Sequence, residues 1–267
     1  MCGIIGFTGR KPAKDILIDG LERLEYRGYD SAGIALLNDD DTLTIRKKAG
    51  RVSELRELCK DGEYSSTCGI GHTRWATHGG VTDANAHPHR CGNVALIHNG
   101  IIENYSDIIR EYGLADKLVS ETDSEVVAAL LDTLYEGDPI TAIRKVVKII
   151  AGSFALCIMF ADRPGIIYAV RNVSPMVAAH SEEGSIIASD LTAIISFSKD
   201  YFVVPEYHIL TMTEGGIKVE DLKGNEVRPQ MLEITWDITA AQKGGFPHFM
   251  LKEIYEQPES LRNTITP

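Results

Sequence analysis

Hydrophobic residues change their spacing several times along the chain, and each change predicts an element. Residues 1–9 are apolar or small, which favours a strand. Pro12 then opens a segment in which Ile16, Leu17, Leu21 and Leu24 recur at the spacing of one helical face. The same reasoning predicts strands at 33–37, 43–47, 68–73 and 94–98, and helices at 53–60, 104–112 and 139–150.

A further helix begins at Thr122, because Thr122 and Glu125 stand three residues apart ahead of an apolar run, as in a capping box. From 153 to 227 the pattern changes to short apolar runs rich in β-formers, with room for one short helix at 191–196. Strands therefore gather at the start and in the second half, with helices grouped between them. This order favours an α+β fold of two antiparallel sheets packed together and covered by helices over a βαβ alternation.

The last stretch, 242–267, contains GGFPHF and two further prolines, which is typical of a linker or boundary segment. The sequence thus predicts one domain over residues 1–241 and a linker over 242–267. No internal repeat or low-complexity tract divides the first part.

Composition narrows the choice of partners and compartment. The chain has 27 Lys and Arg against 38 Asp and Glu, a net charge of −11, which disfavours nucleic acid as a partner. The longest uncharged apolar run, 149–161, is too short to span a bilayer, and no secretory leader is evident, so we expect a cytoplasmic protein without membrane contact. Five cysteines without CxxC spacing indicate free thiols.

Cys2 directly follows the initiator methionine, and removal of Met1 before so small a residue would leave a free α-amine on a cysteine. One residue would then hold a nucleophile and a base, with reference pKa values of roughly 8.5 for the thiol and 7.7–8.0 for the amine. On its own this feature is a weak indication, since cysteine at position 2 is usually without catalytic use.

Three further segments suggest the same chemistry. Arg74 ends a predicted strand before a glycine-terminated loop and is suited to binding a carboxylate in bidentate fashion, although a surface arginine beside a core tryptophan is the plain alternative. Asn99 and Gly100 end another strand and offer two donors for one oxyanion, although Asn-Gly turns are common there. Asp123 lies in a first helical turn, where a carboxylate is more often a cap than an ammonium site.

Taken together, the motifs resemble those of the class II, N-terminal-nucleophile glutamine amidotransferases. Within that family they are most similar to the glutaminase domain of the branch that converts fructose 6-phosphate to glucosamine 6-phosphate. The motifs run in the family's order over almost the whole chain: CGIIGFTG at the N-terminus, LEYRGYDSAG (24–33), HTRWATHG (72–79), NAHPH (85–89), HNGIIEN (98–104), SETDSEV (120–126), GSFA (152–155), ASD (188–190) and HFMLKEIYEQP (248–258).

The resemblance implies a four-layer αββα sandwich of the N-terminal-nucleophile hydrolase type and assigns roles to matching residues. It implies Cys2 as the nucleophile, with Asn99 and Gly100 stabilising the oxyanion. It implies that glutamine is bound by Arg74, Trp75, Thr77, His78, Gly100 and Asp123, with Trp75 also gating ammonia, and that Arg27 and His87 support the site. It implies that the segment 74–82 closes over the substrate.

The resemblance further implies hydrolysis of L-glutamine to L-glutamate and ammonia with no metal and no organic cofactor. In the complete enzyme the ammonia would pass to a sugar isomerase domain that binds fructose 6-phosphate and is absent from this chain, and the full-length enzyme would be a homo-oligomer. The alternatives are the glutaminase domain of another class II amidotransferase, a related cysteine amide hydrolase and a catalytically silent glutamine-binding module.

An alternative interpretation is a structural zinc site, formed by the thiols and imidazoles of Cys68, His72, His87, His89 and Cys91. Their spacing matches no compact zinc finger, so we expect His87 and His89 to support the pocket or neighbouring loops instead.

Overall fold

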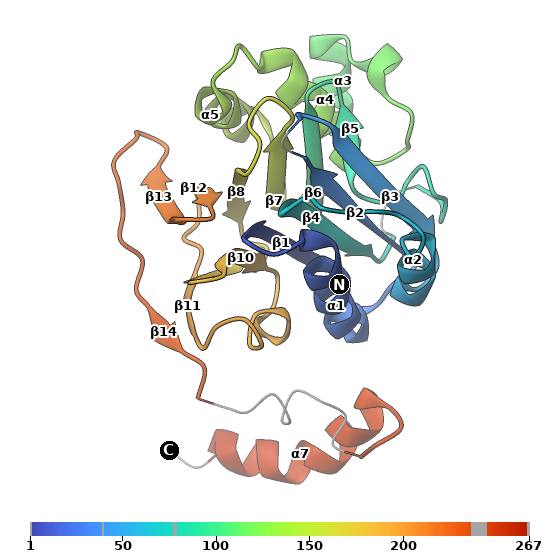
Figure 1. Cartoon of the computed structure of the whole chain (residues 1–267), viewed down its shortest axis with the longest axis vertical. Helices are drawn as coiled ribbons and strands as arrows, with labels where there is room; N and C mark the ends of the chain where they lie inside the picture. The colour runs from blue at the N-terminus through green and yellow to red at the C-terminus, as the bar shows by residue number, and fades with distance from the viewer. Residues whose placement is uncertain (1, 39, 77–78, 236–244, 266–267) are drawn as a thin grey trace.

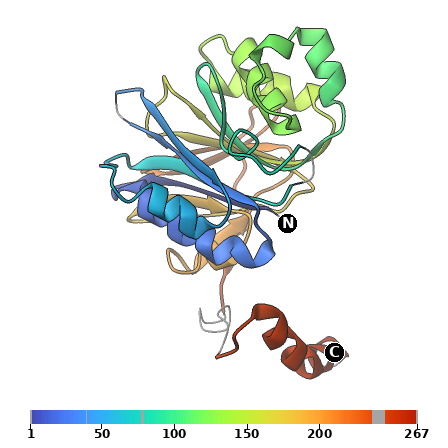
Figure 2. The ribbon, with the colours of Figure 1, turned by 90° about the vertical axis from the view of Figure 1, so that its right-hand side faces the viewer.

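Two antiparallel β-sheets lie face to face in the computed structural model of the chain, with helices on both outer faces (Figures 1 and 2). The structure describes residues 2–38, 40–76, 79–235 and 245–265. The larger sheet has eight strands in the order β14-β11-β9-β10-β1-β4-β2-β3. The smaller has six strands in the order β13-β12-β8-β7-β6-β5.

The eight-stranded sheet comprises β1 (Gly3–Gly9), β2 (Ser31–Leu37), β3 (Leu43–Ala49), β4 (Cys68–Arg74), β9 (Val177–Ser181), β10 (Gly184–Ala188), β11 (Asp200–Val203) and β14 (Leu232–Glu233). The six-stranded sheet comprises β5 (His89–Cys91), β6 (Val94–Ile102), β7 (Gly152–Phe160), β8 (Ile167–Asn172), β12 (His208–Thr213) and β13 (Gly216–Asp221). The helices are α1 (Ala13–Leu24), α2 (Val52–Leu58), α3 (Tyr105–Tyr112), α4 (Asp123–Leu134), α5 (Pro139–Ile149) and α7 (Phe249–Ile265), with short 3₁₀ turns at Glu25–Arg27, Ala115–Lys117 and Leu191–Ala193.

Successive side chains of each central strand point to opposite faces of its sheet, and this explains the four layers. In β7, Leu156 and Ile158 pack toward the helices α4 and α5, whereas Cys157 and Met159 pack between the two sheets. Successive residues of the strand thus alternate between two cores, one on each face of the sheet. Because both faces of such a strand are buried, its sequence is a continuous apolar run rather than an alternating one.

Helices α1 and α2 cover the outer face of the eight-stranded sheet, where Leu17 and Leu21 of α1 pack against Ile5 and Phe7 of β1. Helices α3, α4 and α5 cover the six-stranded sheet. The predicted α+β sandwich with four layers is therefore confirmed.

Strand register decides which residues meet at the ends of the sheets. Gly3 pairs with Thr73 and Ile4 with His72, so Cys2 lies beside the carboxyl end of β4. In the other sheet Asn99 pairs with Ala155 and Gly100 with Phe154. The end of β4 and this part of β6, one from each sheet, define the site described below.

The N-terminus of α4 follows the predicted cap in part. Thr122 accepts a hydrogen bond from the Glu125 N–H, as expected of an N-cap. The Glu125 carboxylate, however, accepts from the N–H groups of Val119 and Ser120 and so fixes the incoming loop rather than closing a capping box with Thr122.

The structure differs from the sequence-based prediction in three places. Strand β6 continues to Ile102, because Ile101 and Ile102 still pair with Ser153 and Gly152, so Asn99 and Gly100 lie within the strand and not at its end. The short strands β5 and β14 were not predicted. Residues 249–265, predicted as part of a linker, form the helix α7, and the division into a domain over 1–241 and a linker over 242–267 stays a prediction. None of the described helices combines the length and the apolar character that crossing a membrane requires.

Candidate active site

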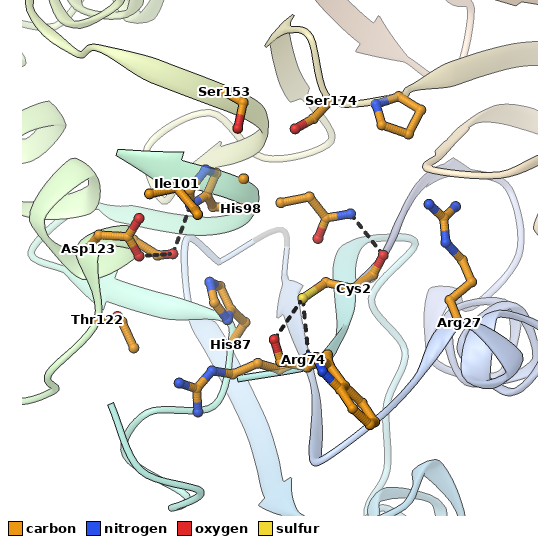
Figure 3. A pocket seen from close by; sticks show the side chains of 15 residues that line it. Cys2, Arg27, Arg74, His87, His98, Ile101, Thr122, Asp123, Ser153 and Ser174 are labelled. Carbon is orange, nitrogen blue, oxygen red and sulfur yellow. Dashed lines mark hydrogen bonds between the residues drawn. The ribbon is translucent and has the colours of Figure 1, made fainter. Parts of the chain in front are cut away.

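A pocket with a volume of about 360 Å³ opens where the ends of the two sheets face each other (Figure 3). The predicted site residues that the structure describes all line it: Cys2, Arg27, Arg74, Trp75, His87, Asn99, Gly100 and Asp123. The predicted residues Thr77 and His78 lie outside the described part of the chain. The fold thus brings together side chains that are up to 121 positions apart in the sequence, from 2 to 123.

Cys2 is half-buried at the entrance to β1, with its sulfur held against the end of β4. The Trp75 N–H donates to Cys2 Sγ at 3.1 Å, and the Cys2 thiol lies 3.6 Å from the Trp75 carbonyl oxygen. Burial raises the pKa of the Cys2 thiol, and the nearby Asp30 carboxylate adds to this, although the Trp75 N–H and Arg74 oppose it. The resting sulfur is therefore a thiol more than a thiolate at neutral pH.

Asn99 reaches across from the six-stranded sheet to Cys2. Its amide Nδ2 donates to the Cys2 carbonyl oxygen at 3.1 Å, and its Oδ1 lies 2.9 Å from His72 Nε2 on β4. Both residues are buried, because they occupy positions that face the space between the sheets. The side-chain amide thereby links β6 to the start of β1 and to β4.

Gly100 adopts a backbone conformation that only glycine takes easily, with φ +137°. A Cβ at this position would lie 2.0 Å from the carbonyl oxygen of Ser153 on the neighbouring strand. Any side chain would therefore push β6 and β7 apart at the wall of the pocket. This explains why Asn99 is followed by glycine although the strand continues.

Arg74 is a buried cation at the end of β4. Its guanidinium donates to the carbonyl oxygens of Gly80 at 3.0 Å and Gly79 at 3.2 Å, and it lies 4.0 Å from an Asp30 oxygen. Asp30 also accepts a short hydrogen bond from the Ala76 N–H. Arg74 thus links Gly79 and Gly80 directly to the pocket wall, and Asp30 links Ala76 to Arg74.

Asp123 places a buried carboxylate at the N-terminus of α4, on the pocket wall opposite Arg74's strand (Figure 3). Its Oδ2 accepts from the Ile102 N–H at 2.8 Å, while Oδ1 lies 3.4 Å from Ser124 Oγ. The carboxylate thus lies at the positive end of the α4 helix dipole, with the Ile102 N–H as its hydrogen-bond donor.

Arg27 supports the start of β1 from the side. It donates to the Ser189 carbonyl oxygen at 2.9 Å and lies 3.4 Å from Asp190, while the Ser189 hydroxyl accepts from the Ile4 N–H. Trp75 packs its ring on Gly28, where a Cβ would lie 2.5 Å from the indole. More than half of the Trp75 side chain is nevertheless exposed, at 54%.

Four buried histidines gather at the pocket: His87 and His98 line it, and His72 and His89 lie beside His87. Burial lowers the pKa of each, to about 3 for His72, so the rings are neutral at physiological pH. The His72 and His87 ring centroids lie 4.1 Å apart, and those of His87 and His89 lie 4.5 Å apart. Among the described residues no group of three or more potential ligands is placed to hold a metal ion.

Several residues of the pocket wall escaped the sequence analysis. The additional lining residues are His98, Ile101, Thr122, Ser124, Ser153, Ser174 and Pro175. Ser124 and Ser153 lie inside motifs that were recognised, SETDSEV and GSFA, so the motifs were a signal for them. Ser174 and Pro175 follow β8 in a loop that only the fold brings to this place.

Comparison with known proteins agrees with this geometry. A family model described as a glutamine amidotransferase domain matches residues 72–196, which include Arg74, Asn99 and Asp123. By this match, residues 72–196 belong to a glutamine amidotransferase domain. The predicted family is thereby confirmed.

The amidotransferase domain is similar over its whole length to longer curated proteins. It is 45% identical over 271 residues to the isomerizing glutamine–fructose-6-phosphate aminotransferase of Fusobacterium nucleatum, covering 99% of this chain and 44% of that protein. Identity to the proteins of the same name is 44% for Thermus thermophilus and 42% for Clostridium tetani, again with 44% of each protein covered. The chain therefore spans less than half the length of these relatives.

Solved structures support the fold of the amidotransferase domain. Glutamine phosphoribosylpyrophosphate amidotransferase from B. subtilis, in complex with ADP and GMP, superposes with a TM-score of 0.72 at 24% identity, over 85% of this chain and 50% of that one. A second structure, described as the allosteric regulatory enzyme of purine biosynthesis, gives a TM-score of 0.73 at 25% identity over 84% of this chain and 50% of that one.

The raised pKa of Cys2 predicts slow alkylation at neutral pH. We expect the rate of carbamidomethylation of Cys2 by iodoacetamide to reach half its maximum at a higher pH than the same cysteine in the unfolded chain, because the thiolate forms later in the buried site. Site-resolved mass spectrometry over a pH series measures this. A midpoint below that of the unfolded chain would contradict the electrostatic description of the pocket.

Proposed function

We propose that the domain hydrolyses L-glutamine to L-glutamate and ammonia, with Cys2 as the nucleophile. The observation that carries the proposal is the Asn99 amide, which donates to Cys2 at 3.1 Å on the wall of a pocket large enough for an amino acid. A nucleophile and a donor for the developing oxyanion thus share one cavity.

The charges around the pocket fit an α-amino acid. Arg74 supplies a buried guanidinium for the α-carboxylate, and Asp123 supplies a buried carboxylate for the α-ammonium. Bound by these two groups, the substrate would extend its side-chain amide toward the sulfur of Cys2. This complementarity favours glutamine over a peptide, in which both charges are missing at the reacting residue.

The reaction is an acyl transfer in two steps. The α-amine of Cys2, free once Met1 has been removed, takes the thiol proton as the sulfur attacks the amide carbon of glutamine. The Asn99 amide and the Gly100 N–H stabilise the tetrahedral oxyanion. Its collapse breaks the C–N bond while the α-ammonium of Cys2 gives its proton to the leaving nitrogen, which departs as ammonia. Water then attacks the γ-glutamyl thioester, which yields glutamate and restores the thiol. No step draws on a metal or an organic cofactor.

We extend the proposal to the segment 74–82 as the part that closes over bound glutamine. Arg74 already binds the carbonyl oxygens of Gly79 and Gly80, so a ligand that binds Arg74 would compete with or reorganise these contacts. Thr77 and His78 would then complete the substrate site, and Trp75 would control the escape of ammonia. Arg27 and His87 would support the site from below.

The names of the relatives suggest where the ammonia goes. Since the chain spans 44% of proteins named isomerizing glutamine–fructose-6-phosphate aminotransferase, we propose that a further domain, beyond residues 242–267, binds fructose 6-phosphate and accepts the ammonia to form glucosamine 6-phosphate. A cytoplasmic homo-oligomer as the complete enzyme remains part of this proposal, and so does the assignment of 1–241 as the glutaminase domain.

A glutamine hydrolysis assay on the chain tests the core of the proposal. With Met1 removed, as verified by intact mass, the chain should release glutamate and ammonia, and a diazoketone analogue of glutamine should form a thioether at Cys2. Cys2→Ser should abolish labelling, whereas Cys91→Ser, which alters a half-buried thiol outside the pocket, should leave both readouts unchanged. Binding of glutamine without turnover or labelling would instead favour the silent binding module.

The two proposed roles of Asn99 and Arg74 predict different kinetics. Asn99→Ala should lower kcat by about 10²-fold or more with little change in KM, because it removes a donor to the transition state. Arg74→Ala should mainly raise KM, because its contact with the substrate carboxylate exists before and during the reaction. Steady-state assays with glutamine distinguish the two patterns. Full turnover of Asn99→Ala would show that its assigned role is wrong.

A further inference from the structure

We propose that His72 is a positioning residue that sets the orientation of the Asn99 side-chain amide and thereby aims its N–H groups at Cys2 and at the oxyanion. The inference rests on the proposed function, since it concerns the donor on which that function depends. It adds a residue that sits behind Asn99, on β4, and does not itself reach the substrate.

The hydrogen bonds of His72 define its tautomer. Its Nε2 lies 2.9 Å from Asn99 Oδ1 and 3.0 Å from the His98 carbonyl oxygen, and both of these atoms are acceptors. Nε2 must therefore carry the proton and donate to both. His72 is fully buried, and burial keeps the ring neutral, so this single N–H is its one donor. Nδ1 is then the unprotonated nitrogen, and it meets no hydrogen-bond partner in the described part of the chain.

The contact with His72 selects one of two possible orientations of the amide. As observed, Oδ1 points to His72 and Nδ2 donates to the Cys2 carbonyl oxygen. A rotation by half a turn would place Oδ1 against that carbonyl oxygen, two acceptors in contact, and Nδ2 against the His72 N–H, two donors in contact. Because the terminal torsion of asparagine is soft, such polar partners and not torsional preference decide its setting.

The surroundings hold the imidazole itself in place. Ile4 opposes His72 across the β1–β4 pair, and the His87 ring packs against it with 4.1 Å between centroids. The donor that orients Asn99 is thus part of the same strand pair that carries Cys2. Cys2, Asn99 and His72 form one chain of hydrogen bonds that crosses from one sheet to the other and back.

Loss of this donor should affect the chemical step more than binding. In His72→Phe the ring shape is kept but the N–H is lost, so the amide would spend much of its time turned away or unfavourably placed. We expect kcat to fall by about 10-fold to 10²-fold, at or below the cost of deleting an oxyanion donor outright, with KM changed by less than about 3-fold. His72→Gln, whose amide nitrogen can donate from nearly the same place, should recover most of the loss.

A double-mutant cycle in the chain from which Met1 has been removed tests the inference. Measurements of kcat and KM for His72→Phe, Asn99→Ala and the double variant should show that His72→Phe costs nothing further once Asn99 is alanine. Ile34→Ala, which truncates a buried residue on β2 that faces the outer helices and not the space between the sheets, serves as a control for general destabilisation and should keep kcat. Nitrogen-15 NMR of labelled histidine should show His72 protonated on Nε2, which tests the geometry even if His72→Phe folds poorly.

The possible outcomes separate this inference from the function on which it rests. If Asn99→Ala loses turnover but His72→Phe keeps it, or if the two losses multiply in full, the positioning role is overturned and the glutaminase proposal stands. If Asn99→Ala itself keeps full turnover, both are overturned. A His72 ring protonated on Nδ1 would also overturn the positioning role.

Discussion

The packing of the two sheets against each other is the constraint on which the candidate site depends. Cys2 and His72 come from the eight-stranded sheet and Asn99 from the six-stranded one, so their separation is set by the side chains between the sheets. Each large apolar side chain buried there contributes about 1.5–3 kcal/mol, against roughly 0.5–1.5 kcal/mol for a single hydrogen bond. The apolar layer, and not the bond from Asn99 to Cys2, therefore fixes the geometry.

This arrangement places polar chemistry at the rim of an apolar layer, and burial has a different effect on each group there. It raises the pKa of the Cys2 thiol, which leaves the thiolate to be formed when a base takes the proton. It lowers the pKa of His72, which keeps that ring a neutral donor of fixed direction. Burial also strengthens the attraction of Arg74 and Asp123 for a ligand of complementary charge, because such a ligand replaces the water that the two groups lose.

Much of the fold could be predicted from the sequence, because the central strands are short continuous apolar runs between turn residues, and the helices α1, α4 and α5 carry apolar residues at helical spacing. What failed depended on pairing: β6 is extended by its partner β7, and β5 exists only because Val94 and Leu96 pair with Cys91 and His89. α7 was missed because its proline-containing segment contradicts local helix propensity.

The site could be predicted as a set of residues but not as an arrangement. The motifs located Cys2, Arg74, Asn99 and Asp123, and the structure places all four around one pocket. The contact between His72 and Asn99 was not predictable, because it requires the facing of two strands from different sheets. His72 stood inside the recognised motif HTRWATHG, yet nothing in the sequence paired it with a residue 27 positions later.

The most direct test of the account is a crystal structure of the processed chain after reaction with the diazoketone analogue of glutamine. We expect a thioether at Cys2 whose ketone oxygen accepts hydrogen bonds from both Asn99 Nδ2 and the Gly100 N–H, with the carboxylate of the adduct on Arg74 and its ammonium on Asp123. An adduct whose oxygen points away from Asn99 and Gly100 would contradict it.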